Sequence, residues 1–173
     1  LIGDSISRGY TQVVRKELAG KANVHRAPAN CGPTRTGLAK LDTWLGEGSW
    51  DVIHFNFGIH DRKTPIPDYT DRLAEILTRL EETDALVIWA TTTPIPEDGT
   101  DGPEVAAGME ERSAAARSLM ESEGVAVNDL AATIRPYLDE LQNPQDVHFS
   151  HKGYEVLGEQ VARSILEEWN RSR

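Results

Sequence analysis

Apolar residues alternate along this chain between short continuous runs and longer segments in which they recur every three or four positions. Continuous runs are typical of strands buried on both faces, and the clearest is Ala85–Ala90, followed by Asp51–Phe57. Weaker strand signals lie at Leu1–Ile2, Asn23–Arg26 and Val125–Val127. The pattern therefore predicts five strands.

The segments between these runs have the periodicity of amphipathic helices. One of them is Tyr69–Glu82, where apolar residues such as Leu73 and Ile76 fall on one face. Other helices are expected at Thr11–Ala19, Thr36–Leu45, Ala131–Leu138 and Gly153–Trp169, with one more that ends near Glu123. Strands that alternate with helices predict an α/β fold, a three-layer α/β/α sandwich with a five-stranded, mostly parallel sheet. No repeat or linker interrupts the pattern, so we expect one domain over residues 1–173.

Candidate chemistry gathers beyond the carboxyl ends of the predicted strands, where sheets of this kind hold their functional sites. The residues that follow predicted strands are Ser5, Gly32, Gly58–Asp61 and the loop at Pro94. Ser5 stands between a strand and a helix, where its hydroxyl is exposed and helix N–H groups can stabilise negative charge. This is the position that a nucleophile requires.

Composition and charge exclude several classes of partner. The formal net charge is −10 without any cluster of Lys and Arg, so neither nucleic acid nor an anionic membrane surface is expected as a partner. The single cysteine, Cys31, excludes an intramolecular disulfide and a multi-cysteine zinc site. No apolar run approaches the roughly 18 residues of a membrane span. Phosphate-loop and dinucleotide fingerprints are absent, and we expect neither a cofactor nor a metal.

The sequence begins at Leu1, inside the first predicted strand, and we expect residues to be missing before it. The lack of a signal peptide therefore carries no information about the compartment. Secreted, periplasmic and cytoplasmic locations stay open, and so does the oligomeric state.

Four short blocks with polar residues follow one another along the chain. They are Gly3-Asp4-Ser5-Ile6, Asn30-Cys31-Gly32-Pro33-Thr34, Gly58-Ile59-His60-Asp61 and Asp146-Val147-His148-Phe149. Together they resemble the blocks of the SGNH hydrolases in the GDSL esterase/lipase superfamily, and the resemblance covers nearly the whole chain. It implies a flavodoxin-like SGNH hydrolase fold and a serine esterase that needs no cofactor.

The resemblance also implies a role for each block. Ser5 would be the nucleophile, His148 the general base, and Asp146 the acid that orients His148. The backbone N–H groups of Ser5 and Gly32, together with the His60 side chain, would hold the oxyanion. Ordinary structural roles are the alternatives, because Ser5 and Asp146 are residue types that cap helices and Gly32 suits any turn with positive φ.

Two positions depart from the family pattern. His60 stands where the family has Asn; a neutral imidazole can donate one N–H to an oxyanion, and a purely structural hydrogen bond is the alternative. The family's acid lies three residues before the histidine, where this chain has Gln145, whereas Asp146 lies only two before. Either the loop lets Asp146 reach Nδ1 of His148, or a carbonyl or a water orients the ring.

Three further polar residues have no catalytic place in this scheme. His54 and Asn56 share one face of a central strand, and we expect them to form structural hydrogen bonds. Cys31 is expected to be a small packed residue.

The loops around the expected site favour one substrate class without determining it. The segments at Pro65–Pro67 and Pro94–Pro103 are short and polar, which favours short acyl groups on polar carriers. We therefore expect a serine esterase that hydrolyses short-chain carboxylic esters, foremost O-acetyl groups on carbohydrate, with a small molecule or polysaccharide as substrate. The alternatives are a lysophospholipase or long-acyl lipase, a thioesterase, and a non-catalytic carbohydrate-binding relative.

Overall fold

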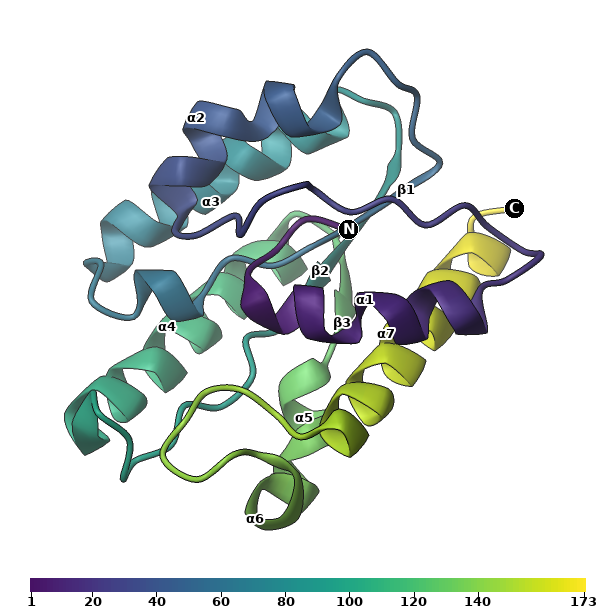
Figure 1. Cartoon of the computed structure of the whole chain (residues 1–173). Helices are drawn as coiled ribbons and strands as arrows, with labels where there is room; N and C mark the ends of the chain where they lie inside the picture. The colour runs from purple at the N-terminus through teal and green to yellow at the C-terminus, as the bar shows by residue number, and fades with distance from the viewer.

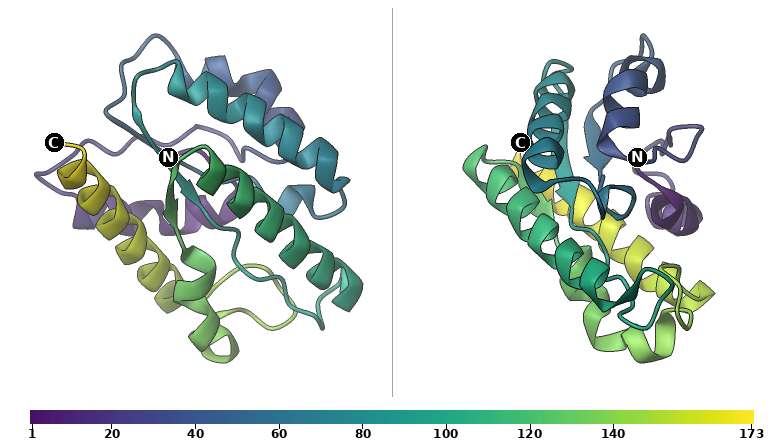
Figure 2. Two further views of the ribbon diagram at one scale, coloured as in Figure 1. Left: turned by 180° about the vertical axis from the view of Figure 1, so that it is seen from behind. Right: turned by 90° about the vertical axis from the view of Figure 1, so that its left-hand side faces the viewer.

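A computed structural model describes all residues, 1–173, and places a parallel sheet between two layers of helices (Figures 1 and 2). The sheet consists of β1 (Val52–Phe55), β2 (Leu86–Ala90) and β3 (Ala126–Asn128), in the spatial order β1-β2-β3. Strand β1 pairs with β2 from Val52, which lies opposite Leu86. The arrangement is the α/β/α sandwich that the alternation of strands and helices predicts.

The predicted number of strands is wrong, because the sheet has three strands and not five. Leu1–Ile2 forms only one parallel bridge, to Phe55, since two residues are too few for a regular ladder. The expected strand Asn23–Arg26 is irregular, and the next residue, Ala27, donates a single backbone hydrogen bond to Leu1. Leu1–Ile2 nevertheless lies beside β1, and the Asn23–Arg26 segment lies beside Leu1, in the places of two outer strands.

The helices lie close to the predicted positions. They are α1 (Ser5–Glu17), α2 (Thr34–Leu45), α3 (Ile66–Glu81), α4 (Gly102–Ser122), α5 (Leu130–Ile134), α6 (Leu138–Leu141) and α7 (His151–Arg171), with short 3-10 helices η1 (Ile59–Asp61) and η2 (Arg135–Tyr137). Helix α1 begins well before the predicted Thr11, because the Asp4 side chain caps it. The predicted helix Ala131–Leu138 is divided into three pieces, since Pro136 cannot continue the hydrogen-bond ladder.

Side chains of β2 alternate between two hydrophobic cores, one on each face of the sheet. Ile88 and Ala90 pack with α1, α5 and α7, whereas Val87 and Trp89 pack with α2, α3 and α4. Successive side chains of a strand point to opposite faces, so a strand covered on both sides needs a continuous apolar run. This is why Ala85–Ala90 is the clearest strand signal in the sequence.

Helices α1 and α7 lie side by side on one face of the sheet (Figure 1). Glycines allow the close approach: a Cβ at Gly158 of α7 would lie 2.5 Å from the Cβ of Val13, and a Cβ at Gly9 of α1 would lie 2.2 Å from the ring of Tyr154. A larger residue at Gly158 would force the helices apart, because the Tyr10 backbone oxygen also lies 3.1 Å away, whereas one at Gly9 would require the Tyr154 ring to move. The two helices therefore have a closely defined relative position.

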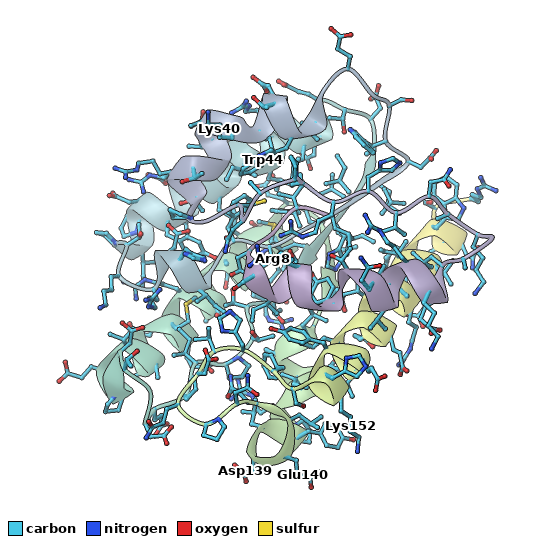
Figure 3. All side chains as sticks on the ribbon, viewed as in Figure 1. Arg8, Lys40, Trp44, Asp139, Glu140 and Lys152 are labelled. Carbon is cyan, nitrogen blue, oxygen red and sulfur yellow. The ribbon has the colours of Figure 1, made fainter.

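The outer surface carries the charged residues. Lys40 on α2, Asp139 and Glu140 on α6, and Lys152 on α7 are exposed (Figure 3). No helix has the length and apolar character that crossing a bilayer would require.

Candidate active site

Ser5 is the first residue of α1, at the sharp turn from the Leu1–Ile2 segment into the helix. The N-cap of this helix is Asp4 and not Ser5, because an Asp4 side-chain oxygen accepts the Ile6 N–H at 2.9 Å. The Ser7 hydroxyl donates to the Asp4 carbonyl at 2.8 Å and fixes the turn from its other side. The Ser5 hydroxyl is therefore not needed as a cap.

Ser5, His148 and Asp146 form one hydrogen-bonded group. The Ser5 Oγ lies 2.8 Å from His148 Nε2, and His148 Nδ1 lies 2.8 Å from Asp146 Oδ1. With the Nδ1–H donating to the carboxylate, Nε2 has a free lone pair and can accept the serine proton. The structure thus brings together a hydroxyl, a base and an acid from the two ends of the chain.

A tight turn before His148 explains how Asp146 reaches the ring. The Asp146 N–H donates to the Asn143 carbonyl at 3.1 Å, and the Asn143 N–H donates to the His148 carbonyl at 2.9 Å. Inside this turn Gln145 has a φ of 57°, in the left-handed region that few residues adopt. Figure 1 shows the loop below the first turn of α1. The turn directs the Asp146 carboxylate back toward the imidazole.

The Asp146 carboxylate is ionised at neutral pH. Partial burial raises the pKa of Asp146, but the hydrogen bonds that the carboxylate accepts from His148 outweigh burial and leave this pKa below its ordinary value. This negative carboxylate accepts a hydrogen bond from Nδ1 and so orients the imidazole ring.

Gly32 and His60, which are expected to donate to an oxyanion, differ in how freely they could reach a ligand beside Ser5. Gly32 has a φ of 63°, which favours glycine, and its N–H donates to the Asn30 side-chain oxygen at 3.1 Å. His60 lies in η1, is exposed, and borders the same hollow as Ser5 and His148. Gly32 does not border that hollow.

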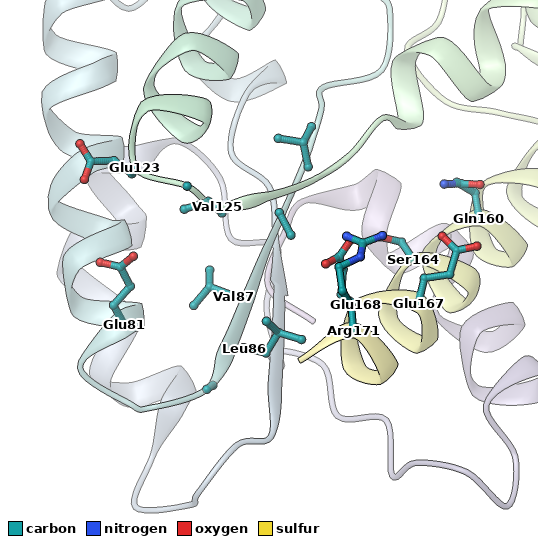
Figure 4. A pocket seen from close by; sticks show the side chains of 14 residues that line it. Glu81, Leu86, Val87, Glu123, Val125, Gln160, Ser164, Glu167, Glu168 and Arg171 are labelled. Carbon is teal, nitrogen blue, oxygen red and sulfur yellow. The ribbon is translucent and has the colours of Figure 1, made fainter. Parts of the chain in front are cut away.

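The hollow beside Ser5 has a volume of about 220 Å³. Its walls come from the Gln145–His148 segment, η1 and the loop between β2 and α4. The lining residues other than Ser5, Asp146 and His148 are Ile59, His60, Arg62, Ile95, Pro96, Gly99, Thr100, Asp101, Gln145 and Val147. A larger hollow of about 760 Å³ lies at the opposite edge of the sheet, among Glu81, Glu123 and Glu167 (Figure 4). It contains none of the Ser–His–Asp residues.

The loop between β2 and α4 is held in place by ion pairs. Asp101 accepts from Arg62 Nε at 2.7 Å and lies 3.0 Å from Lys63 Nζ. The hydrogen bond from Lys63 makes the largest contribution to lowering the pKa of Asp101. Arg62 and Lys63, which border η1, are thus both paired with Asp101.

Asp61 is a buried carboxylate to which the sequence assigns no role. It accepts the Thr34 N–H at 2.7 Å, the Thr34 hydroxyl at 2.9 Å and the Thr64 hydroxyl at 3.0 Å. These bonds connect η1, which carries His60, with the start of α2, two residues after Gly32. Its place in the block beside His60 is the only signal that the sequence provides.

The expectation of structural roles for His54 and Asn56 is confirmed. The Asn56 side-chain amide donates to the Ala90 carbonyl at 2.8 Å, and His54 Nε2 lies 3.0 Å from the Asn128 amide nitrogen. Burial lowers the pKa of His54 to about 3, so the ring is neutral. No group of three or more His, Cys, Asp or Glu side chains is placed to hold a metal ion.

A hydroxyl, an imidazole and a carboxylate in this geometry, on an α/β/α sandwich, define a serine hydrolase. Residues 1–156 match the family described as the GDSL-like Lipase/Acylhydrolase family, and the chain belongs to that family. It is a serine ester hydrolase of the GDSL/SGNH type. Comparison with curated proteins finds no match.

Solved structures with the same fold include esterases. An acetyl xylan esterase, AlAXEase, has a TM-score of 0.81 and 16% identity over 95% of this chain and 98% of that one. Axe2, an acetylxylan esterase from Geobacillus stearothermophilus, has a TM-score of 0.80 and 18% identity over 99% and 95%. TesA has a TM-score of 0.76 and 18% identity over 96% and 97%. At these identities the likeness shows the fold.

Proposed function

We propose that this hydrolase removes short acyl groups, foremost acetyl groups, from carbohydrate esters. The observation that carries the proposal is the hollow of about 220 Å³ beside the Ser5 hydroxyl, which is bordered by the tethered loop between β2 and α4. So small a space has to receive the acyl group together with part of the alcohol. Two acetyl xylan esterases among the structures with this fold support the same substrate class.

In the proposed mechanism, Ser5 Oγ attacks the ester carbonyl carbon while His148 Nε2 takes the hydroxyl proton. The tetrahedral intermediate collapses, the carbon–oxygen bond to the alcohol breaks, and His148 returns the proton to the leaving oxygen. A water then attacks the acyl-Ser5 ester, with His148 again as base, and releases the acid. Asp146 keeps the imidazole oriented and stabilises its protonated form.

Three donors are proposed for the oxyanion: the backbone N–H groups of Ser5 and Gly32 and the His60 ring. Losing one such donor typically raises the barrier by about 3 kcal/mol. The Gly32 N–H donates to Asn30 in the free protein, so the oxyanion has to displace the Asn30 oxygen to use this donor.

The substrate class is tested with a series of p-nitrophenyl esters and with acetate release from acetylated xylan, acetylated pectin and mono-acetylated sugars. A short pocket gives the highest kcat/KM at acetyl or propionyl. A long acyl pocket instead adds about 0.8 kcal/mol of binding for each buried methylene. A rise up to octanoyl, without acetate from any glycan, would establish the long-acyl lipase or thioesterase alternative. Failure of a fluorophosphonate to label Ser5 would establish a non-catalytic relative.

A further inference from the structure

We propose that Arg26 is a positioning residue for catalysis, which holds together the two backbone segments that supply oxyanion donors. This inference rests on the proposed acyl-enzyme mechanism at Ser5. Arg26 lies outside the four family blocks and does not border the hollow beside Ser5. It therefore acts through backbone groups and not by contact with substrate.

One side of the guanidinium holds the turn before the nucleophile. Arg26 Nη2 donates to the Gly3 carbonyl at 3.0 Å and to the Asp4 carbonyl at 2.9 Å, and it lies 3.1 Å from the Ser7 hydroxyl. The Asp4 carbonyl and the Ser5 N–H belong to the same peptide group. A hydrogen bond to this oxygen fixes the peptide plane, and thereby the direction of the N–H, and polarises the group so that the N–H is a stronger donor.

The other side of the guanidinium holds the segment that leads to Gly32. Arg26 Nη1 donates to the Ala27 carbonyl at 2.6 Å and to the Ala29 carbonyl at 3.0 Å. The Gly3 carbonyl, which Arg26 also contacts, accepts the Cys31 N–H at 3.2 Å. Arg26 and the backbone of Cys31 thus join the Ser5 turn to the residue directly before Gly32.

Arg26 forms no salt bridge, and the Asp4 carboxylate acts on its charge only from beyond ion-pair distance. No carboxylate lies within 4.0 Å of the guanidinium, its acceptors are four carbonyls and one hydroxyl, and its Nε is buried without a hydrogen bond. Burial makes the largest contribution to lowering the pKa of Arg26. An unpaired cation behind the Ser5 peptide favours negative charge on the far side of that peptide, where the oxyanion forms.

The test compares Arg26→Gln and Arg26→Lys with a control, Arg79→Gln. Arg79 is also largely buried and also donates to a backbone carbonyl, that of Leu38 at 2.7 Å, but it joins α3 to α2 away from Ser5. Each protein is checked for folding by circular dichroism, and its active sites are counted by fluorophosphonate labelling. The kcat, the KM and the affinity for a boronic acid, which mimics the tetrahedral intermediate, are then measured per labelled site.

Arg26→Gln is expected to lower kcat per labelled site by roughly 10- to 100-fold, with KM nearly unchanged, because misplaced donors act on the transition state. Boronic acid affinity falls by a similar factor. Arg26→Lys keeps the charge but cannot hold both segments. Its kcat and boronic acid affinity are expected between those of Arg26→Gln and those of the wild type. Arg79→Gln retains wild-type kcat. If Arg26→Gln does not fold, the inference is tested with Arg26→Lys alone: lowered kcat and boronic acid affinity support it, and wild-type values contradict it.

If the Arg26 variants keep the kcat and the boronic acid affinity of the wild type, this inference is wrong, but the proposed function is unaffected. A loss of stability without a change in kcat per labelled site would overturn it as well, because the role of Arg26 would then be structural. A wild-type protein that neither turns over esters nor reacts with fluorophosphonate would overturn the proposed function, and this inference with it.

Discussion

The Ser5 hydroxyl has one hydrogen-bond partner, His148 Nε2, and no part in capping its own helix. At the scale of the residue, the removal of this hydroxyl therefore separates chemistry from folding. Replacing the Asp146 carboxylate should likewise affect chemistry more than folding, because Asp146 is half-exposed and contacts the His148 ring from a surface turn.

Ser5→Ala should abolish detectable esterase turnover, because removal of a triad nucleophile costs several orders of magnitude, while the thermal midpoint stays within a few degrees of wild type. Ser122→Ala is the control, since Ser122 is an exposed helical serine whose hydroxyl donates only to a backbone carbonyl. Initial rates with p-nitrophenyl acetate and a melting curve are sufficient. Retention of more than about a tenth of the activity would rule out Ser5 as the nucleophile.

Asp146→Asn should lower kcat by up to about 10⁴-fold, because an amide can hold the His148 ring in the wrong tautomer. Gln145→Asp should change little, since the acid position is already occupied from Asp146. Steady-state kinetics of both variants decide the matter. A harmless Asp146→Asn together with a faster Gln145→Asp would indicate a Ser–His dyad.

At the scale of the element, β1 carries a titratable side chain into the core. His54 is 1% exposed, its ring packs edge-on against Tyr10, and Asn128, its hydrogen-bond partner, accepts in turn from Gln160. The neutral ring thus forms part of the packing between β1, α1, β3 and α7.

The stability of the fold should fall as the pH is lowered from about 6.5 toward 3. Burial lowers the pKa of His54 from 6.5 to about 3, so in this range the unfolded chain binds a proton that the folded protein excludes. One such proton contributes a slope of at most about 1.4 kcal/mol per pH unit. Urea unfolding at several pH values measures it. His54→Gln should flatten the slope, and an equal slope in wild type and variant would contradict this assignment.

At the scale of the whole molecule, the site joins segments that are far apart in sequence. The Asp101 pairs with Arg62 and Lys63 connect the β2–α4 loop to η1 across the hollow. Such pairs are worth little to global stability when exposed, but here they limit how far the loop can open.

Asp101→Asn should therefore widen the acyl preference. We expect kcat/KM for longer esters to rise relative to acetyl, by up to about fourfold for each methylene that the freed loop can cover. Asp42→Asn is the control, because Asp42 pairs with Arg79 on the far side of the sheet. The ratio of hexanoyl to acetyl activity is the measurement. An unchanged ratio in Asp101→Asn would show that the tether does not set specificity.

Much of the fold follows from the periodicity of apolar residues, because burial on one or two faces leaves a local trace in the sequence. The error is at the outer positions, where weak strand signals at Leu1–Ile2 and Asn23–Arg26 predict two strands that do not form. Leu1–Ile2 makes only one bridge, and the segment near Arg26 is held by side-chain and single backbone hydrogen bonds. The blocks locate Ser5 and His148. The contact of Asp146 with His148 depends on the left-handed backbone of Gln145, which the residue types do not reveal. The ion pair of Arg62 is with Asp101, 39 positions away, so the sequence around Arg62 cannot predict it.

The close packing of α1 against α7 has a consequence for how this protein can diversify. Ser5 is the first residue of α1 and His148 lies three residues before the start of α7, so the close packing of these two helices helps to set the distance between the Ser5 hydroxyl and the His148 ring. The walls of the hollow come mainly from η1 and the β2–α4 loop, which belong to other parts of the chain. Insertions in η1 or in the β2–α4 loop can therefore change which substrates fit the hollow without moving Ser5 relative to His148. Specificity and the arrangement of the reactive side chains can then evolve separately.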